Sequence, residues 1–136
     1  MTRDVAVIFN TAFGWAGAAM SGEGIQIIAL PSREKKNVER ELRAAGFTLA
    51  TTQSAIIRKT VKLLQKFFDA KLVSFDLPLD LSYHTIFQQA VWKAAAAIPY
   101  GETRSYQWIA KKIGKPKAAR AVGQALGANP VPILIP

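Results

Sequence analysis

The spacing of apolar residues changes along this chain, and the change limits the folds open to it. The first thirty residues hold three short β-rich runs, at 5–9, 14–20 and 25–30, separated by breaks that contain or border glycine. Such runs predict three strands joined by tight turns. Further along, apolar residues recur every three or four positions, which is the repeat of a helix. We therefore expect an α/β N-terminal lobe, with a three-stranded antiparallel sheet plus helices, followed by a mostly α domain.

Two helices are expected in the N-terminal lobe. Ser32 is placed to cap a charged helix over 33–45, which Gly46 ends. A second helix begins near Ser54, and its apolar residues fall on one face that can cover a sheet. These residues are Ile57, Val61, Leu64 and Phe68. We interpret this face as core and not as a binding site.

A segment around Pro78 separates the two domains. Residues 72–81 alternate apolar side chains around the proline, which is typical of an extended linker or an edge strand. We place the domains at 1–79 and 80–136. The second domain opens with a helix that Pro99 ends. The apolar face of this helix consists of Phe87, Val91, Ala94 and Ile98.

The charge of the chain favours nucleic acid as the partner. Eighteen Lys and Arg residues stand against nine Asp and Glu residues, a net charge of +9. Residues 1–79 hold eleven basic and seven acidic residues, whereas 80–136 hold seven basic and two acidic ones. The ratio of basic to acidic residues is therefore higher in the second domain. Basic surfaces also occur in proteins without a nucleic-acid role, so the charge needs the support of a motif.

Neither export nor a membrane span is predicted. The longest apolar runs, such as 94–98, fall far short of the ~20 residues that a span needs. The first ten residues include Asp4 and lack the apolar core of a signal peptide. We therefore expect a cytoplasmic protein with no membrane partner.

Two short helices joined by a glycine-containing turn are expected in the second domain. Ser105 is placed as the N-cap of the first, Gly114 ends it, and Pro116 suits the first turn of the next, which runs through Leu126. This arrangement is typical of a helix-turn-helix. Ordinary helical hairpins share the spacing, so spacing alone leaves DNA binding and simple packing equally open.

The second of these helices has a nearly bare outward side. Its inward residues are Ala118, Ala121, Val122 and Ala125, and its outward residues are Arg120, Gly123, Gln124 and Gly127. A glycine inside a helix costs ~1 kcal/mol relative to alanine, so Gly123 indicates the close approach of another surface. Another helix of the same chain is one explanation. The lone Arg120 favours a nucleic-acid groove instead, where one long side chain can probe the base stack.

Several segments of the second domain together resemble the C-terminal domain of the O6-alkylguanine-DNA alkyltransferases, the methylated-DNA-protein-cysteine methyltransferase family. They are Phe87-Gln-Gln-Ala-Val-Trp92, Ile98-Pro-Tyr-Gly-Glu-Thr103, Ser105-Tyr106, Lys117-Ala-Ala-Arg-Ala-Val-Gly123 and Asn129-Pro-Val-Pro-Ile-Leu-Ile-Pro136. Phe13-Gly14-Trp15 and Gly24-Ile25 resemble the family's N-terminal lobe more weakly. The resemblance implies a winged-helix-like helix-turn-helix domain that enters the minor groove and swings a damaged guanine out of the stack.

The resemblance also implies roles for single residues. Arg120 matches the arginine that fills the gap left in the duplex, and Tyr106 matches the tyrosine that crowds a phosphate and helps rotate the nucleotide. Asn129 matches the asparagine that braces the turn before the reactive residue. Gly123 and Gln124 complete the predicted DNA-binding set. The structural alternatives are a half-buried first-turn residue for Tyr106, a solvated charge for Arg120 and a simple turn former for Asn129.

The resemblance places the alkyl acceptor, a cysteine, directly after Pro136. The sequence contains no cysteine, so we predict no catalytic residue in this chain and no alkyl transfer by it. The single histidine, His84, does not match the family's histidine and is interpreted as a surface or cap residue without a metal role. No following residues exist to cover the apolar run 131–135, so we expect a piece of a longer protein.

The function implied by the resemblance is DNA repair. The partner is double-stranded DNA that carries O6-alkylguanine, bound by a monomer that needs no metal or organic cofactor. The intact family protein moves the alkyl group irreversibly onto its own cysteine. Two alternatives stay open: a non-enzymatic alkyltransferase-like protein that binds lesions, and a helix-turn-helix regulator whose N-terminal lobe binds an effector.

Overall fold

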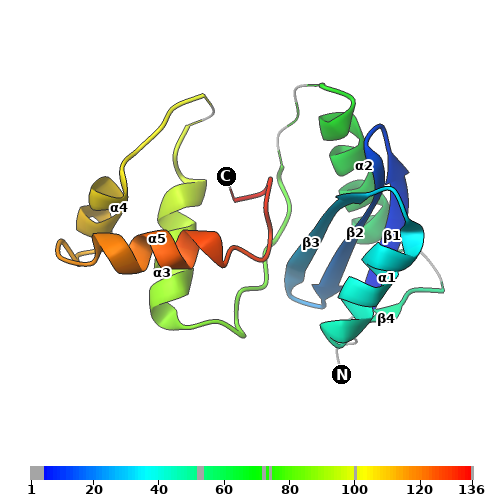
Figure 1. Cartoon of the computed structure of the whole chain (residues 1–136), viewed down its shortest axis with the longest axis horizontal. Coiled ribbons are helices and arrows are strands. Elements are labelled where there is room, and N and C mark those ends of the chain that lie inside the picture. The colour runs from blue at the N-terminus through cyan, green and yellow to red at the C-terminus, as the bar shows by residue number, and fades with distance from the viewer. Residues whose placement is uncertain (1–4, 52–53, 72, 74, 100, 136) are drawn as a thin grey trace. The chain divides into compact units, whose positions relative to one another are not determined.

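The chain divides into two compact units, Met1–Asp80 and Leu81–Pro136 (Figure 1). The computed structural model describes residues 5–51, 54–71, 73, 75–99 and 101–135.

Within its described residues, the first unit contains a four-stranded sheet in the order β3-β2-β1-β4. The strands are β1 (Val5–Thr11), β2 (Gly14–Ser21), β3 (Gly24–Ser32) and β4 (Thr48–Leu49). The three expected strands pair antiparallel, and β4 adds to β1 in parallel. The predicted count of three strands is therefore wrong. The fourth strand has two residues, too few to display the alternation by which a strand is recognised.

Two helices pack on this sheet, α1 (Lys35–Ala44) and α2 (Ala55–Phe68). Val38 and Leu42 of α1 join a buried cluster with Ala6, Ala19, Ala29 and Phe47. Successive side chains of a strand point to opposite faces, so the buried Val7 and Phe9 of β1 line the other side of the sheet. Ile57 and Leu64 of α2 are buried, as the expected apolar face requires.

The expected helix starts are right for α2 and wrong for α1. The Ser54 hydroxyl accepts the backbone N–H of Ile57 at 3.4 Å and so caps α2. Ser32 does not cap α1, because β3 continues through Ser32, which pairs with Trp15. The N-cap is Glu34, without a side-chain hydrogen bond. Strand pairing across the sheet thus overrides a local capping signal.

The segment around Pro78 forms an edge of the first unit. Leu79 makes a parallel bridge with Ile25, whose N–H donates to the Pro78 carbonyl at 2.9 Å and whose carbonyl accepts the Asp80 N–H at 2.8 Å. The Asp80 carboxylate also accepts hydrogen bonds from the Ser21 hydroxyl and from Nε2 of Gln26. Residues 78–80 therefore pair with the edge of β3 through one isolated bridge and do not form a strand of the sheet, while residues 72 and 74 of the expected linker lie outside the described residues.

The second unit contains three helices among its described residues, α3 (Ile86–Ala96), α4 (Tyr106–Lys112) and α5 (Ala119–Gly127). Thr85 and Gln88 form a capping box that starts α3. Val91, Trp92, Ala94 and Ala95 of α3 are buried. The Trp92 indole N–H donates to the carbonyl of Ala125 at 2.8 Å, which fixes α3 against α5.

Trp92→Phe is expected to lower the free energy of unfolding by about 1.5 kcal/mol, because it removes the indole hydrogen bond and leaves a small void. Urea denaturation followed by circular dichroism measures this loss. Trp108→Phe is the matched control, since Trp108 is only half-buried and its loss is expected to be near 0.5 kcal/mol. Equal losses for the two variants would show that the Trp92 hydrogen bond contributes nothing.

Candidate nucleic-acid interface

The helix α4 begins and ends where the sequence predicts. The Ser105 hydroxyl accepts the Trp108 N–H at 3.0 Å, which is an N-cap. The last helical residue is Lys112, and Gly114 follows with φ +77, a left-handed conformation that favours glycine. Pro116 is not in the first turn of the next helix, because α5 begins only at Ala119. Its carbonyl instead accepts Nε2 of Gln107 at 2.7 Å, which ties the turn to α4.

The outward side of α5 carries the predicted arginine. Arg120, Gln124 and Gly127 are exposed, while Val122 and Ala125 are buried. Ala121 was placed inward by the helical phase but is exposed, since it lies at the border of the two sides. Arg120 makes no hydrogen bond or ion pair within the described part of the chain. Its guanidinium is therefore available to a partner.

The structure brings Tyr106 and Gly123 together. Tyr106 is the first residue of α4 and is 54% exposed. A Cβ placed on Gly123 would lie 2.8 Å from Cε2 of Tyr106, so the ring lies directly against the α5 backbone. Packing within the chain thus accounts for Gly123, although through a side chain and not through a helix. Gly127 has open space in front of it.

Asn129 closes the loop that follows α5. Its Nδ2 donates to the carbonyl of Ile135 at 2.7 Å, and its Oδ1 accepts the Val131 N–H at 2.9 Å. Both ends of the amide therefore bind backbone of the same loop. The expectation that this apolar run lacks cover is wrong for two of its members, since Val131 is 0% and Ile135 is 1% exposed.

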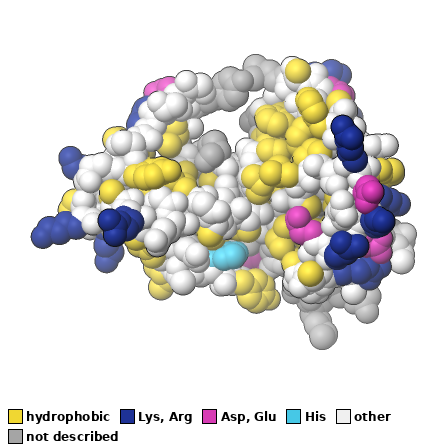
Figure 2. Space-filling view, in the orientation of Figure 1, with side chains coloured by type: hydrophobic (Ala, Val, Ile, Leu, Met, Phe, Trp, Pro, Cys, Tyr) yellow, Lys and Arg dark blue, Asp and Glu magenta, His cyan; other side chains and the backbone are white. Residues whose placement is uncertain are grey.

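A contact group at the start of α4, made by Glu102, Arg104 and Trp108, was not predicted. The Arg104 guanidinium pairs with Glu102 at 2.8 Å and lies over the Trp108 ring, 5.3 Å from its centroid. Arg104 precedes the N-cap of α4, so the four-residue spacing of helical neighbours does not predict its contact with Trp108. Glu102 is the one acidic residue of 81–136, against seven basic residues. On the face drawn in Figure 2, basic side chains project from the end of the second unit that carries α4 and α5.

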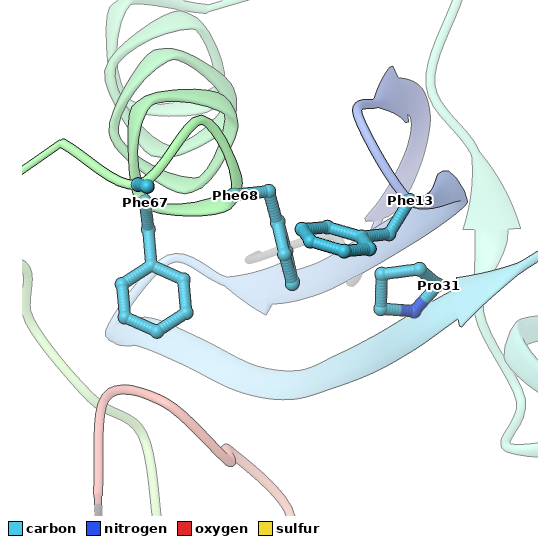
Figure 3. A pocket seen from close by; sticks show the side chains of 5 residues that line it. Phe13, Pro31, Phe67 and Phe68 are labelled. Atoms are coloured by element: carbon cyan, nitrogen blue, oxygen red, sulfur yellow. The ribbon is translucent and has the colours of Figure 1, made fainter.

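The other candidate sites offer no reactive group. A pocket in the first unit is lined by Phe13, Pro31, Phe67, Phe68 and Ala70, and the rings of Phe13 and Phe68 meet edge to face in it (Figure 3). Its lining is apolar, so it holds no acid, base or nucleophile. The ring of His84 packs on Trp92, with centroids 4.8 Å apart. Among the described residues, no three His, Cys, Asp or Glu side chains are grouped to hold a metal, and no helix is long and apolar enough to span a bilayer.

Residues 86–136 match the family model described as 6-O-methylguanine DNA methyltransferase, DNA binding domain. The crystal structure of Mycobacterium tuberculosis O6-methylguanine methyltransferase aligns with a TM-score of 0.73 and 36% identity, over 100% of this chain and 76% of that protein. The chain belongs to the O6-methylguanine methyltransferase family. The resemblance predicted from the sequence is confirmed.

Curated members of the O6-methylguanine methyltransferase family match part of the chain. The methylated-DNA-protein-cysteine methyltransferase of Methanosarcina barkeri is 53% identical over 79 residues, 58% of this chain and 49% of that protein. The methylated-DNA-protein-cysteine methyltransferase of Mycobacterium bovis is 57% identical over 76 residues, 56% of this chain and 46% of that protein. The matched segment thus spans about half the length of these relatives. A crystal structure of Mycobacterium tuberculosis OGT in complex with DNA has a TM-score of 0.74 and 36% identity, over 96% of this chain and 74% of that protein.

Proposed function

We propose that this chain binds double-stranded DNA that carries O6-alkylguanine, with α5 in the minor groove. The observation that carries the proposal is the exposed side of α5, where Arg120 stands without a partner among the described residues and shares that side with Gln124 and the open backbone at Gly127. A slender helix with one long cation can enter a narrow groove, where bulky neighbours would be excluded. A relative whose structure was solved in complex with DNA supports the DNA-binding part of this proposal.

The proposed binding mode is that of a winged-helix-like helix-turn-helix made by α4, the turn at Gly114 and α5. Extruding a base costs a few kcal/mol, and less for a damaged or mispaired one. Arg120 would fill the vacated space, because a guanidinium can both stack on a base and donate hydrogen bonds to the orphaned partner. Tyr106 would crowd the phosphate beside the lesion, and Gln124 would contact the groove from the same side of α5.

Recognition and chemistry are separate in this proposal. Transfer of an alkyl group in this family ends on a protein cysteine, and the 136 residues contain none. Asn129 would brace the loop that leads toward the acceptor position, since both ends of its amide bind that loop. We propose that recognition is made by a cytoplasmic monomer without a metal or cofactor.

The affinity for matched duplexes tests the proposal. The chain is expected to bind a duplex with one O6-methylguanine about tenfold more tightly than the same duplex with guanine, because the damaged pair costs less to open. Fluorescence anisotropy at fixed salt measures both constants, since phosphate contacts make affinity salt-dependent. Equal affinities would contradict lesion recognition, and selection of one sequence from random undamaged duplexes would favour a helix-turn-helix regulator.

A further inference from the structure

We infer that Gly123 is a positioning residue that acts through Tyr106: its missing side chain provides a seat for the tyrosine ring on α5. This inference rests on the proposed function, because it concerns where the ring stands when DNA is bound. It differs from the expectation drawn from the sequence, in which Gly123 itself makes room for another molecule.

The contact is specific to one edge of the ring. A Cβ on Gly123 would lie 2.8 Å from Cε2, 3.1 Å from Cδ2 and 3.6 Å from Cζ of Tyr106. The Cζ atom bears the hydroxyl, so the seat determines the position of the phenol oxygen as well as of the ring. Cβ contacts shorter than about 3 Å are sterically forbidden, so any other residue at position 123 must displace the ring.

Gly123 and Gly127 lie on the same helix, and only one of them has this contact. Glycine is a poor helix former, so each glycine weakens α5. At Gly127 no heavy atom beyond the adjacent residues and the helix's own backbone lies within 4 Å of the place that a Cβ would take, whereas at Gly123 the tyrosine fills that space. The two glycines therefore separate the effect of helix propensity from the effect of the seat.

The side chain of Tyr106 moves more readily than its backbone. The Ser105 cap fixes the first turn of α4 through the Trp108 N–H, whereas Tyr106 is 54% exposed and its side chain has room to move. A Cβ at position 123 would therefore turn the ring outward and leave the helices in place. Arg120 lies three residues before Gly123, on the adjacent turn of α5. The seat thus holds the ring beside the surface that carries Arg120, and a side chain held in its bound position loses less entropy on binding.

A double-mutant cycle on the full chain tests the inference. Gly123→Ala is expected to weaken binding to the O6-methylguanine duplex about fivefold when Tyr106 is present, and by less than twofold in the Tyr106→Ala background. Tyr106→Phe keeps the ring, so Gly123→Ala is expected to retain most of its effect in that background. Equal losses with and without the ring would show that the new methyl group meets DNA directly, and would overturn the inference.

Two measurements without DNA separate this inference from the proposed function. Nuclear Overhauser contacts between the Tyr106 ring and the Gly123 Hα protons are expected in the wild-type chain. Their absence would contradict the inference that the ring packs on Gly123. Gly127→Ala is expected to raise Tm, because alanine favours the helix more than glycine does. Gly123→Ala is expected to raise Tm in the Tyr106→Ala background for the same reason. In the wild-type background Gly123→Ala is expected to raise Tm less, because the new methyl group displaces the ring. A wild-type chain with these contacts but without lesion preference would contradict the proposed function and, with it, the role of the seat in binding.

Discussion

Incubated with a duplex that carries radiolabelled O6-methylguanine, the 136-residue chain is expected to bind the duplex and to acquire no label. Alkyl transfer needs a strong nucleophile, and a thiolate is the strongest that a protein side chain offers near neutral pH. The chain has no cysteine, and the apolar pocket of its first unit contains no other nucleophile. Gel electrophoresis with autoradiography measures the label bound to protein.

The control for this experiment is the state of the DNA. The recovered duplex is expected to retain all of its O6-methylguanine after digestion and chromatography, even when anisotropy shows that it was fully bound. Label that reaches one equivalent per chain would show that another residue is the acceptor. Loss of the methyl group from DNA without labelled protein would show a hydrolytic activity that the proposal does not contain.

The sequence predicts those parts of the fold that depend on local signals. Breaks that contain or border glycine delimit β1, β2 and β3, and the serine caps of α2 and α4 lie at the expected positions. The errors arise where partners distant in sequence decide. Ser32 belongs to β3 because it pairs with Trp15 of β2. The strand β4 forms by pairing with the edge of β1 that β2 leaves open.

The candidate site divides in the same way. Helical phase places Arg120 and Gln124 on the exposed side of α5, and it misplaces Ala121 because a residue at the border of two faces is decided by the neighbouring helices. The contact of Tyr106 with Gly123 depends on how α4 crosses α5. The helical repeat of the sequence does not predict the crossing angle of two helices. The glycine at position 123, which weakens the helix, did indicate that another group lies close to α5 at that point.

Arg120→Ala is expected to weaken binding to the O6-methylguanine duplex about 30-fold and binding to the undamaged duplex about threefold. Stacking in a vacated site is worth roughly 2 kcal/mol, which is lost only where a base has been extruded. On intact DNA the same side chain makes at most a phosphate contact, whose loss is small and independent of sequence. Anisotropy titrations of both duplexes at one salt concentration give the two ratios.

Two matched variants decide whether the guanidinium or merely its charge is responsible. Arg120→Lys keeps the charge but presents a compact ammonium that stacks poorly, so most of the lesion-specific loss is expected to remain. Lys117→Ala removes an exposed cation from the turn before α5 and is expected to weaken both duplexes by the same factor. If Arg120→Ala also weakens binding to both duplexes by the same factor, Arg120 is a phosphate contact. Another side chain must then fill the space that the extruded base leaves. Arg120 makes no hydrogen bond or ion pair with the described residues, so a loss of binding in Arg120→Ala is not expected to arise from a damaged fold. An unchanged circular dichroism spectrum and Tm of the variant would establish this directly.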